Sequence, residues 1–264
     1  MNSSLTRPLA VVTGASSGIG YELAKQFAQN GFDLVVTSTN SSINDAAQTF
    51  NGMGANVETV QADLATYDGV ETLYRQIKET NRPVEAIAIN AGVGVGGPFV
   101  ETDLQEELNL IELNVVSTVH LAKRVVKDMV DRGRGKVLFT SSIAALMPGP
   151  FEAVYAASKT FIHSFAEGLR NELKDTDVTV TALMPGATDT NFFHRAGMDD
   201  TKVGTDQKDD PAEVAKQGFE ALMAGKDDIV AGSLKTKLQA NVSKVLPDTV
   251  NAEQHRKLSE PGSA

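Results

Sequence analysis

Apolar residues gather in short runs rich in Val, Ile and Leu, and longer amphipathic segments separate these runs. The runs typical of buried strands are LAVVT at 9–13, DLVVTS at 33–38, ANVETV at 55–60, AIAIN at 86–90, KVLFTSS at 136–142 and VTVTALM at 178–184. Helix-length segments lie between them at 18–29, 66–80, 102–132 and 152–174. Apolar strands that alternate with helices are typical of a parallel sheet covered on both faces. The pattern therefore predicts an α/β fold with a doubly wound, Rossmann-like parallel sheet in three layers.

The length of 264 residues favours a single domain. We expect a dinucleotide-binding catalytic domain over 1–246, with a substrate lid over about 187–210, where Asp, Thr and Lys are frequent. Apolar residues thin out after Pro247, so 247–264 is predicted to be a polar, poorly ordered tail. Ligands of open parallel sheets bind beyond the carboxyl ends of the strands, and the chemistry should be sought there.

Composition excludes several classes of function. The chain has no cysteine, which removes disulfides, thiolate nucleophiles and cysteine-ligated metals. A net charge of -10 argues against nucleic acid or an anionic membrane surface as partner. The start MNSSLTRP lacks a signal-peptide pattern and no run of about 18 apolar residues occurs, so a cytoplasmic protein is expected. No metal site is expected, because metal-ligand spacing is absent among His120, His163, His194 and His255.

The first predicted strand runs directly into the turn TGASSGIG at 13–20. Glycines in such a turn permit a tight bend, close approach of a pyrophosphate and close packing of helix on strand, with the phosphate at the helix N-terminus. The turn also matches G-x-S-x-G, but a nucleophile elbow follows a central strand and only about a dozen residues precede Ser16. A P-loop is excluded because Gly-Lys-Ser/Thr is missing. The expected cofactor contacts are Gly14, Ser16, Ser17, Gly18, Ile19 and Gly20.

The end of the second strand bears on the choice between NAD and NADP. A carboxylate about 20 residues past the glycines would favour NAD, and an arginine would favour the 2′-phosphate of NADP. This chain has the neutral hydrogen-bonding residues Ser38, Thr39 and Asn40 there. Because nothing at this point repels a phosphate, we expect NADP(H) to be preferred over NAD(H).

A tyrosine and a lysine four residues apart form the candidate acid/base pair. In a helix both side chains project from one face. Spacing alone does not identify the pair, since it occurs at Tyr155 with Lys159, at Tyr21 with Lys25 and at Tyr74 with Lys78.

The context of Tyr155 separates it from the other two tyrosines. Thirteen residues upstream, a predicted strand ends in Ser141-Ser142, and beyond the following helix another strand ends in Met184-Pro185-Gly186. Three strand ends then meet at one crevice. The chain resembles the short-chain dehydrogenase/reductase family, in its shorter single-domain branch, from Leu9 to about Leu246. The matching motifs are TGASSGIG at 13, Asp63-Leu64, Asn90-Ala91-Gly92, Asn114, Ser142, Tyr155-x-x-x-Lys159 and Pro185-Gly186 with Thr190.

This resemblance implies a role for each matching position. Tyr155 would be the acid/base, Ser142 would hold the substrate oxygen, Lys159 the nicotinamide ribose and Asn114 a proton-relay water. The alternative for Asn114 is a purely structural role, as a polar residue whose hydrogen bonds are made between two helices. The usual Asn-Asn-Ala-Gly motif has Ile89 as its first residue here. Further cofactor contacts are implied for Asp63 and Leu64, for Asn90, Ala91 and Gly92, and for Pro185, Gly186, Thr188 and Thr190.

Physical chemistry supports these roles. An alkoxide formed by hydride delivery needs a proton, while a free phenol of pKa about 10 is a poor base near neutrality. A lysine ammonium on the next turn favours phenolate, and lowering a pKa by about 3 units corresponds to roughly 4 kcal/mol. A hydroxyl donor to the oxyanion, such as Ser142, is typically worth ~2 to 4 kcal/mol.

The resemblance also implies a substrate wall, formed by residues after Ser142 and by the lid after Pro185; it is mostly apolar, which favours a neutral ketone or secondary alcohol with a hydrophobic flank. The resemblance also implies a homodimer or homotetramer through the helices at 102–132 and 152–174. The predicted activity is that of an NAD(P)-dependent carbonyl reductase or alcohol dehydrogenase; the alternative is a catalytically silent dinucleotide-binding regulator on the same fold. The wall residues are Ala144, Leu146, Met147, Pro148, Phe151, Phe192, Phe193 and Met198, with Arg195 as the single basic residue among them.

Overall fold

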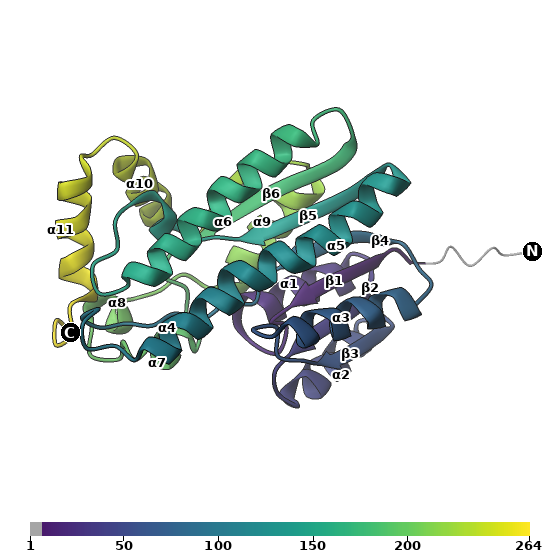
Figure 1. Ribbon diagram of the computed structural model, residues 1–264, viewed down its shortest axis with the longest axis horizontal. Coiled ribbons are helices and arrows are strands. Elements are labelled where there is room, and N and C mark those ends of the chain that lie inside the picture. Colours follow the sequence, from purple (N-terminus) through teal and green to yellow (C-terminus); the bar gives the residue numbers. More distant parts are fainter. Residues whose placement is uncertain (1–6) are drawn as a thin grey trace, which may run out of the picture.

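The computed structural model describes residues 7–264. Residues 1–6 lie outside this part, and so does most of the segment MNSSLTRP on which the expectation about a leader rests. Figure 1 shows the C-terminal helix at one end of the molecule.

Seven parallel strands form one sheet over the described residues, in the order β3-β2-β1-β4-β5-β6-β7. The chain order reverses between β1 and β4, which is the switch point at which such sheets bind ligands. This confirms the predicted doubly wound parallel sheet. The strands are β1 Leu9–Thr13, β2 Asp33–Ser38, β3 Val57–Gln61, β4 Val84–Ile89, β5 Arg134–Thr140, β6 Asp177–Pro185 and β7 Asp228–Ala231.

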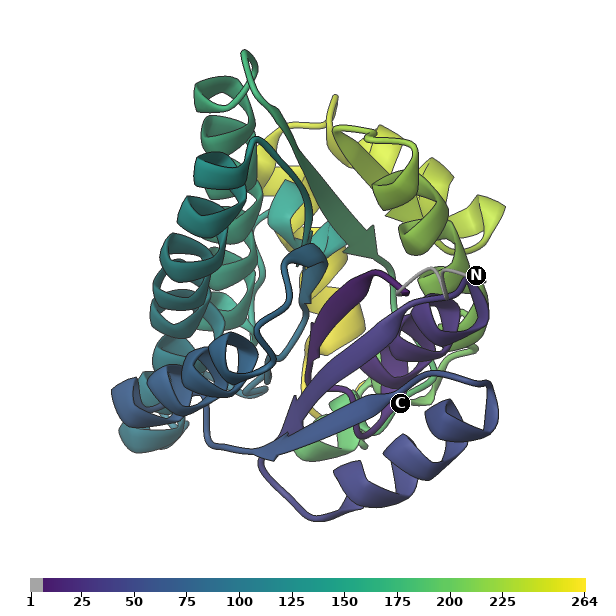
Figure 2. The same ribbon diagram turned by 90° about the vertical axis from the view of Figure 1, so that its right-hand side faces the viewer.

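Helices cover both faces of the sheet, and Figure 2 shows the resulting three layers. On one face Leu73, Val125 and Ile162 from α3, α5 and α6 pack against the strands. On the other face Leu23 and Phe219 from α1 and α9 do so. No helix of residues 7–264 is both long and apolar enough to span a bilayer. The helices are α1 Gly18–Gln29, α2 Ser42–Gly52, α3 Tyr67–Glu79, α4 Leu104–Ile111, α5 Ser117–Arg132, α6 Ala153–Glu172, α7 Phe192–Arg195, α8 Lys202–Thr205, α9 Pro211–Met223, α10 Leu234–Ser243 and α11 Asp248–Ser259.

The central strands read as continuous apolar runs because both of their faces are covered. Every residue of β1 and of β2 is buried. Full burial of Val, Leu and Ile side chains contributes roughly 1.5 to 3 kcal/mol each, so these strands form the rigid frame beneath the site. Edge strand β7 was not predicted, because its DIVA sequence is short and only partly buried.

The helix predicted over 102–132 is not continuous. Asp103 caps α4 by accepting from the backbone amides of Gln105 and Glu106, and a π-helical turn at Glu112–Val116 separates α4 from α5. Such turns insert an extra residue and are frequent at functional sites. This one carries Asn114, whose side chain points to the loop after β4.

The prediction of a poorly ordered tail over 247–264 is wrong for most of that segment. Residues Asp248–Ser259 form α11, which packs at one end of the molecule beside α10 (Figure 1). Its buried residues are Asn251, His255 and Ser259, one every four residues. The face of this helix that packs against the protein is therefore polar. An analysis of apolar periodicity does not detect such a face.

The segment over 187–210, expected to be a lid, contains the short helices α7 and α8 and a small apolar cluster. Phe193, Ala196 and Met198 are its buried members. The backbone at Thr188 pairs with that at Asp209, so the segment leaves and rejoins the body at nearby points. Its function as a lid stays a prediction.

Candidate active site

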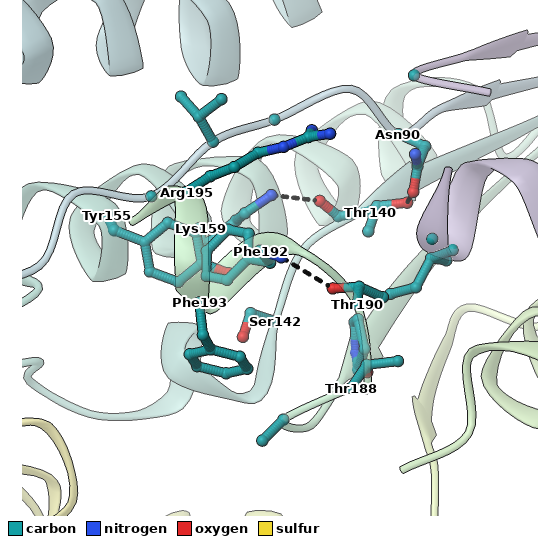
Figure 3. A pocket seen from close by; sticks show the side chains of 18 of the residues that line it. Asn90, Thr140, Ser142, Tyr155, Lys159, Thr188, Thr190, Phe192, Phe193 and Arg195 are labelled. Carbon is teal, nitrogen blue, oxygen red and sulfur yellow. Dashed lines mark hydrogen bonds between the residues drawn. The ribbon is translucent and has the colours of Figure 1, made fainter. Parts of the chain in front are cut away.

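A cavity of about 400 Å³ lies beyond the carboxyl ends of the central strands. Its wall is built from the turn after β1, the loops after β4 and β5, the start of α6, the segment after β6 and the C-terminal helix α11. Figure 3 shows the central part of this wall, with Ser142, Tyr155 and Lys159 facing Phe192 and Phe193 of the segment after β6.

The glycine turn at the start of α1 leaves backbone amides without side-chain caps. Gly14 and Gly18 have φ values of +68° and +59°, which other residues rarely adopt. A Cβ at Gly20 would overlap the carbonyl oxygen of Gly14 and lie 2.5 Å from Asn90 Nδ2. Ser17 at the helix start makes no capping bond and the first turn holds no acidic residue. A phosphate fits this helix start, where free N–H groups and the helix dipole both attract an anion.

Asn90 joins the ends of three neighbouring strands. The hydroxyl oxygen of Thr13 accepts from the backbone amides of Asn90 and Ala91 at 2.8 and 2.9 Å. The Asn90 side chain donates to the Thr13 carbonyl at 3.1 Å and accepts from the Thr140 hydroxyl at 3.0 Å. These bonds fix the loop after β4 at the floor of the cavity.

Lys159 reaches the cavity from α6. Its side chain is buried, with 6% of its surface exposed, and Nζ donates to the Thr140 carbonyl at 3.0 Å (Figure 3). Burial lowers the pKa of Lys159 to about 8, because the desolvated ammonium has no carboxylate to compensate it. The lysine is charged at neutral pH and is poised to lose a proton under mildly alkaline conditions.

Tyr155 lies one helical turn before Lys159, and the Lys159 Nζ is 5.7 Å from the centre of its ring. Burial raises the pKa of the Tyr155 phenol above its usual value, the nearby charge of Glu152 raises it further, and a hydrogen bond with Ser142 lowers it. The Ser142 hydroxyl also accepts from the backbone amide of Ala144 at 3.1 Å. Tyr155 and Ser142 therefore meet, as the spacing of their motifs predicted, and the phenol is protonated at neutral pH.

Asn114 is held behind the cavity wall. Its amide donates to the Val93 carbonyl at 2.9 Å and to Ser158 Oγ at 3.1 Å, and its oxygen accepts from the Val93 amide at 3.0 Å. The side chain is buried and clamps the loop after β4 onto α6. It does not line the cavity. Its expected part in a proton relay stays a prediction.

A family profile described as short chain dehydrogenase matches residues 8–201. The chain belongs to the short-chain dehydrogenase family. As a member it is an NAD(P)-dependent oxidoreductase. The sequence of oxidoreductase UcpA from Salmonella typhimurium is 28% identical over 250 residues, which cover 94% of this chain and 93% of that protein. An uncharacterized oxidoreductase, YmfI from Bacillus subtilis, is 31% identical over 189 residues, covering 70% and 77% of the two chains.

A solved structure of a short-chain dehydrogenase from Sphingobium yanoikuyae in complex with NADPH superimposes on this dehydrogenase with a TM-score of 0.79 and 28% identity. The match covers 84% of this chain and 87% of that one. A short-chain dehydrogenase/reductase from Burkholderia phymatum in complex with NAD has the same fold, with a TM-score of 0.79 and 23% identity over 85% and 88% of the two chains.

Most of the predicted cofactor contacts of this dehydrogenase line the cavity. Asp63 does not: its carboxylate accepts from the Ala65 amide at 3.0 Å and closes the turn after β3. At the end of β2 the Ser38 hydroxyl donates to Ser16 Oγ at 3.0 Å, and Thr39 is exposed. The predicted positions in the wall are Gly14, Ser16, Ser17, Gly18, Ile19, Gly20, Ser38, Thr39, Asn40, Leu64, Asn90, Ala91, Gly92, Tyr155, Lys159, Pro185, Gly186, Thr188 and Thr190.

The predicted substrate wall is only partly correct. Ala144, Met147, Phe192 and Phe193 line the cavity, and the Phe192 ring lies 5.1 Å from that of Tyr155. Phe151 does not line it, because its ring packs under the guanidinium of Arg256 in α11. The other expected wall residues outside the cavity are Leu146, Pro148 and Met198.

Sequence reasoning missed a polar part of the wall. Glu152, which directly precedes α6, lines the cavity together with His255 and Ser259 of α11. Glu152 lies three residues before Tyr155. That proximity in sequence was the available signal for Glu152, whereas the two α11 residues are about 100 positions away from it.

Proposed function

We propose that this dehydrogenase is a carbonyl reductase or alcohol dehydrogenase acting on a neutral carbonyl or secondary alcohol with a hydrophobic flank. The observation that carries the proposal is that Ser142, Tyr155 and Lys159 meet in one cavity, whose far end is the glycine turn of α1. A dinucleotide-binding regulator would need the turn but not an acid/base group, so the silent alternative is not favoured.

Each of the three side chains has a role in moving a proton at one oxygen. A bound nicotinamide cofactor would supply or accept the hydride. In the reduction direction the protonated Tyr155 hydroxyl donates to the oxygen of the former carbonyl, which the Ser142 hydroxyl holds. In the oxidation direction the phenolate must form, and the Lys159 ammonium on the next turn favours it. The raised pKa of the phenol suits the enzyme as a proton donor at neutral pH.

The uncapped start of α1 and the glycines around it fit the pyrophosphate of the cofactor. A Cβ at Gly92 would lie 3.0 Å from Asn114 Oδ1 and 3.3 Å from Lys159 Nζ, so the loop after β4 passes close beside the lysine. We propose a preference for NADP(H) over NAD(H), since the neutral Ser38, Thr39 and Asn40 hold no carboxylate against a 2′-phosphate.

We propose that the active form is a homodimer or homotetramer. Exposed Leu104, Leu108 and Ile111 support this, because their spacing places them on one face of α4, and contiguous exposed apolar residues mark interfaces. Gel filtration with light scattering would test it. The cytoplasmic location expected from the sequence stays a prediction that cell fractionation would test. The large exposed apolar residues of α4, the π turn, α5 and α6 are Leu104, Leu108, Ile111, Val116, Val119, Val130 and Phe161.

The decisive test is Tyr155→Phe, with Tyr74→Phe as matched control. Tyr74 has the same spacing to a lysine, and its hydroxyl donates to Asp128 at 3.0 Å outside the cavity. Fluorescence titration with NADPH and NADH measures binding, and turnover of a carbonyl panel measures activity. We expect Tyr155→Phe to bind cofactor as the wild type does and to lose about 10³-fold in turnover. Tyr74→Phe should retain turnover. Undiminished turnover in Tyr155→Phe would refute the assigned role.

A further inference from the structure

The end of the cavity next to Tyr155 is closed by a polar cluster that the proposed reaction does not use. Glu152 stands before the first turn of α6, and α11 places His255 and Ser259 against it. All three side chains line the cavity, yet only 6%, 8% and 2% of their surfaces are exposed. A buried carboxyl group is costly unless it is paired or used, so this cluster requires an explanation.

The hydrogen bonds of the cluster fix where its protons are. Ser259 Oγ donates to Glu152 Oε2 at 3.1 Å, and His255 Nε2 lies 3.5 Å from the same oxygen. His255 Nδ1 lies 3.1 Å from the carbonyl oxygen of Pro150. Because a carbonyl oxygen only accepts, Nδ1 carries a hydrogen and donates it.

The remaining nitrogen of His255 then faces a carboxyl oxygen. A bare Nε2 beside a carboxylate would repel it, so one proton must be shared between Glu152 and His255. As long as that proton is bound, the pair is neutral as a whole, whichever partner holds it; above neutral pH the proton is lost and Glu152 is charged. Burial raises the pKa of Glu152 to about 7 and lowers the pKa of His255, and both directions agree with a neutral pair.

One oxygen of the cluster is left for a ligand. Glu152 Oε1 makes no hydrogen bond to any group within residues 7–264, whereas Oε2 is occupied by Ser259. Glu152 lines the cavity, so its carboxyl group belongs to the wall that a substrate would meet. Once ionised, the Glu152 carboxyl raises the pKa of Tyr155, which places it within electrostatic reach of the reacting centre.

The neutrality of the pair decides which ligand group fits. An ammonium would give up its hydration without meeting a net negative charge, and an anion would meet no net positive charge. A hydroxyl group can donate to Glu152 Oε1, and it can accept from His255 Nε2 when that nitrogen holds the proton, because the 3.5 Å from Nε2 to Oε2 is long for a hydrogen bond. Beside the cluster, the wall formed by Met147, Phe192 and Phe193 is apolar.

We propose that Glu152 and His255, positioned by Ser259, bind a hydroxyl group of the substrate away from the reacting carbon, so that the preferred substrates are hydroxy ketones and the corresponding diols. This inference rests on the proposed carbonyl reductase activity and narrows its substrate class. Glu152 and His255 are specificity-determining residues, and Ser259 is a positioning residue.

The test compares each hydroxy ketone with the ketone of the same carbon skeleton that lacks the hydroxyl. The measured quantity is the ratio of the two kcat/KM values. In the wild type this ratio should exceed ten. The ketone without the hydroxyl leaves the buried carboxyl of Glu152 without a hydrogen-bond partner, and this weakens its binding. Glu152→Met removes the carboxyl while keeping a similar length, and the ratio should fall toward one, mainly through a higher KM for the hydroxy ketone.

Glu107→Met is the matched control. Glu107 is equally buried, in α4, and does not line the cavity. The same substitution there should leave the ratio unchanged. If Glu152→Met does not fold, His255→Gln and Ser259→Ala serve instead, with a large loss of the ratio expected for the first and a smaller loss for the second.

Several outcomes would overturn the proposal. A wild-type enzyme that turns over both ketones equally would refute the subsite while the reductase activity stands. An unchanged ratio in Glu152→Met would also refute the subsite. Preference for an amino ketone over the hydroxy ketone would show that the subsite binds a cation and not a hydroxyl group. If wild type and Tyr155→Phe both fail with every carbonyl compound of the panel, the proposed function itself fails and the subsite with it.

Discussion

The Nζ of Lys159 lies 5.7 Å from the centre of the Tyr155 ring while it donates to the Thr140 carbonyl at 3.0 Å. The lysine is therefore tied to β5 and faces the phenol from the next turn of α6. Its buried ammonium is useful for chemistry but destabilises the fold without a bound ligand, because desolvation lowers its pKa to about 8.

Lys159→Met should lower turnover by at least about 100-fold, and its stability relative to the wild type should be higher at pH 7 than at pH 10. The folded-state pKa lies below the ordinary value of 10.5. Stability from this group is therefore fully present above that ordinary value and is lost as pH falls through about 8. The shift corresponds to about 3 kcal/mol. Urea denaturation of both proteins without cofactor, at pH 7 and pH 10, measures the unfolding free energies that are compared.

The comparison between the two pH values removes other differences from this measurement. Loss of the bond to Thr140 costs the methionine variant about 1 to 3 kcal/mol at both pH values. Titration of Glu152 is common to both proteins. The difference in unfolding free energy should thus move in favour of Lys159→Met on going from pH 10 to pH 7. A difference that stays constant would show that the lysine is not desolvated.

Glu152→Gln should shift the pH profile of alcohol oxidation to lower pH. The pKa of Glu152 is about 7, so above neutrality its charge raises the pKa of Tyr155. Glutamine carries no charge, and the phenolate required for oxidation then forms at lower pH. The profile of kcat/KM between pH 6 and 10 measures the shift, and Glu107→Gln provides the control. Coincident profiles for wild type and Glu152→Gln would contradict the coupling.

The sheet could be predicted because its information is local. LAVVT at 9–13 and DLVVTS at 33–38 are apolar runs buried on both faces, and they coincide with β1 and β2. Most of the expected cofactor positions line the cavity, since they lie in turns directly after such strands. The prediction failed where burial is polar. Asn251, His255 and Ser259 fasten α11 through hydrogen bonds, and no hydrophobic period reveals that.

The partners of the site residues could not be predicted either. Motif spacing indicated that Tyr155 and Lys159 share a helix face, but the acceptor of the lysine is a backbone carbonyl of another element. The bonds of Asn114 to Val93 depend on a π turn, which the amphipathic pattern of 102–132 does not show. Contacts of this kind arise only when distant segments pack together.

Gly20→Ala should disable cofactor binding through the geometry of the turn after β1. The added methyl would overlap the Gly14 carbonyl oxygen and approach Asn90 Nδ2 to 2.5 Å. Neither group can withdraw easily, because the Asn90 amide also donates to the Thr13 carbonyl at 3.1 Å. We expect a destabilisation of about 1 to 3 kcal/mol and at least a tenfold weaker binding of NADPH, measured by thermal unfolding and fluorescence titration.

Gly52→Ala is the control for this substitution. Gly52 is the last residue of α2, and an added Cβ there meets no described atom within 4 Å. The exchange should leave NADPH binding unchanged and alter stability by less than about 1 kcal/mol, since alanine is the better helix former. If Gly20→Ala bound NADPH as tightly as Gly52→Ala, the turn would have room for a side chain. Close packing at this glycine would then not be what shapes the phosphate site.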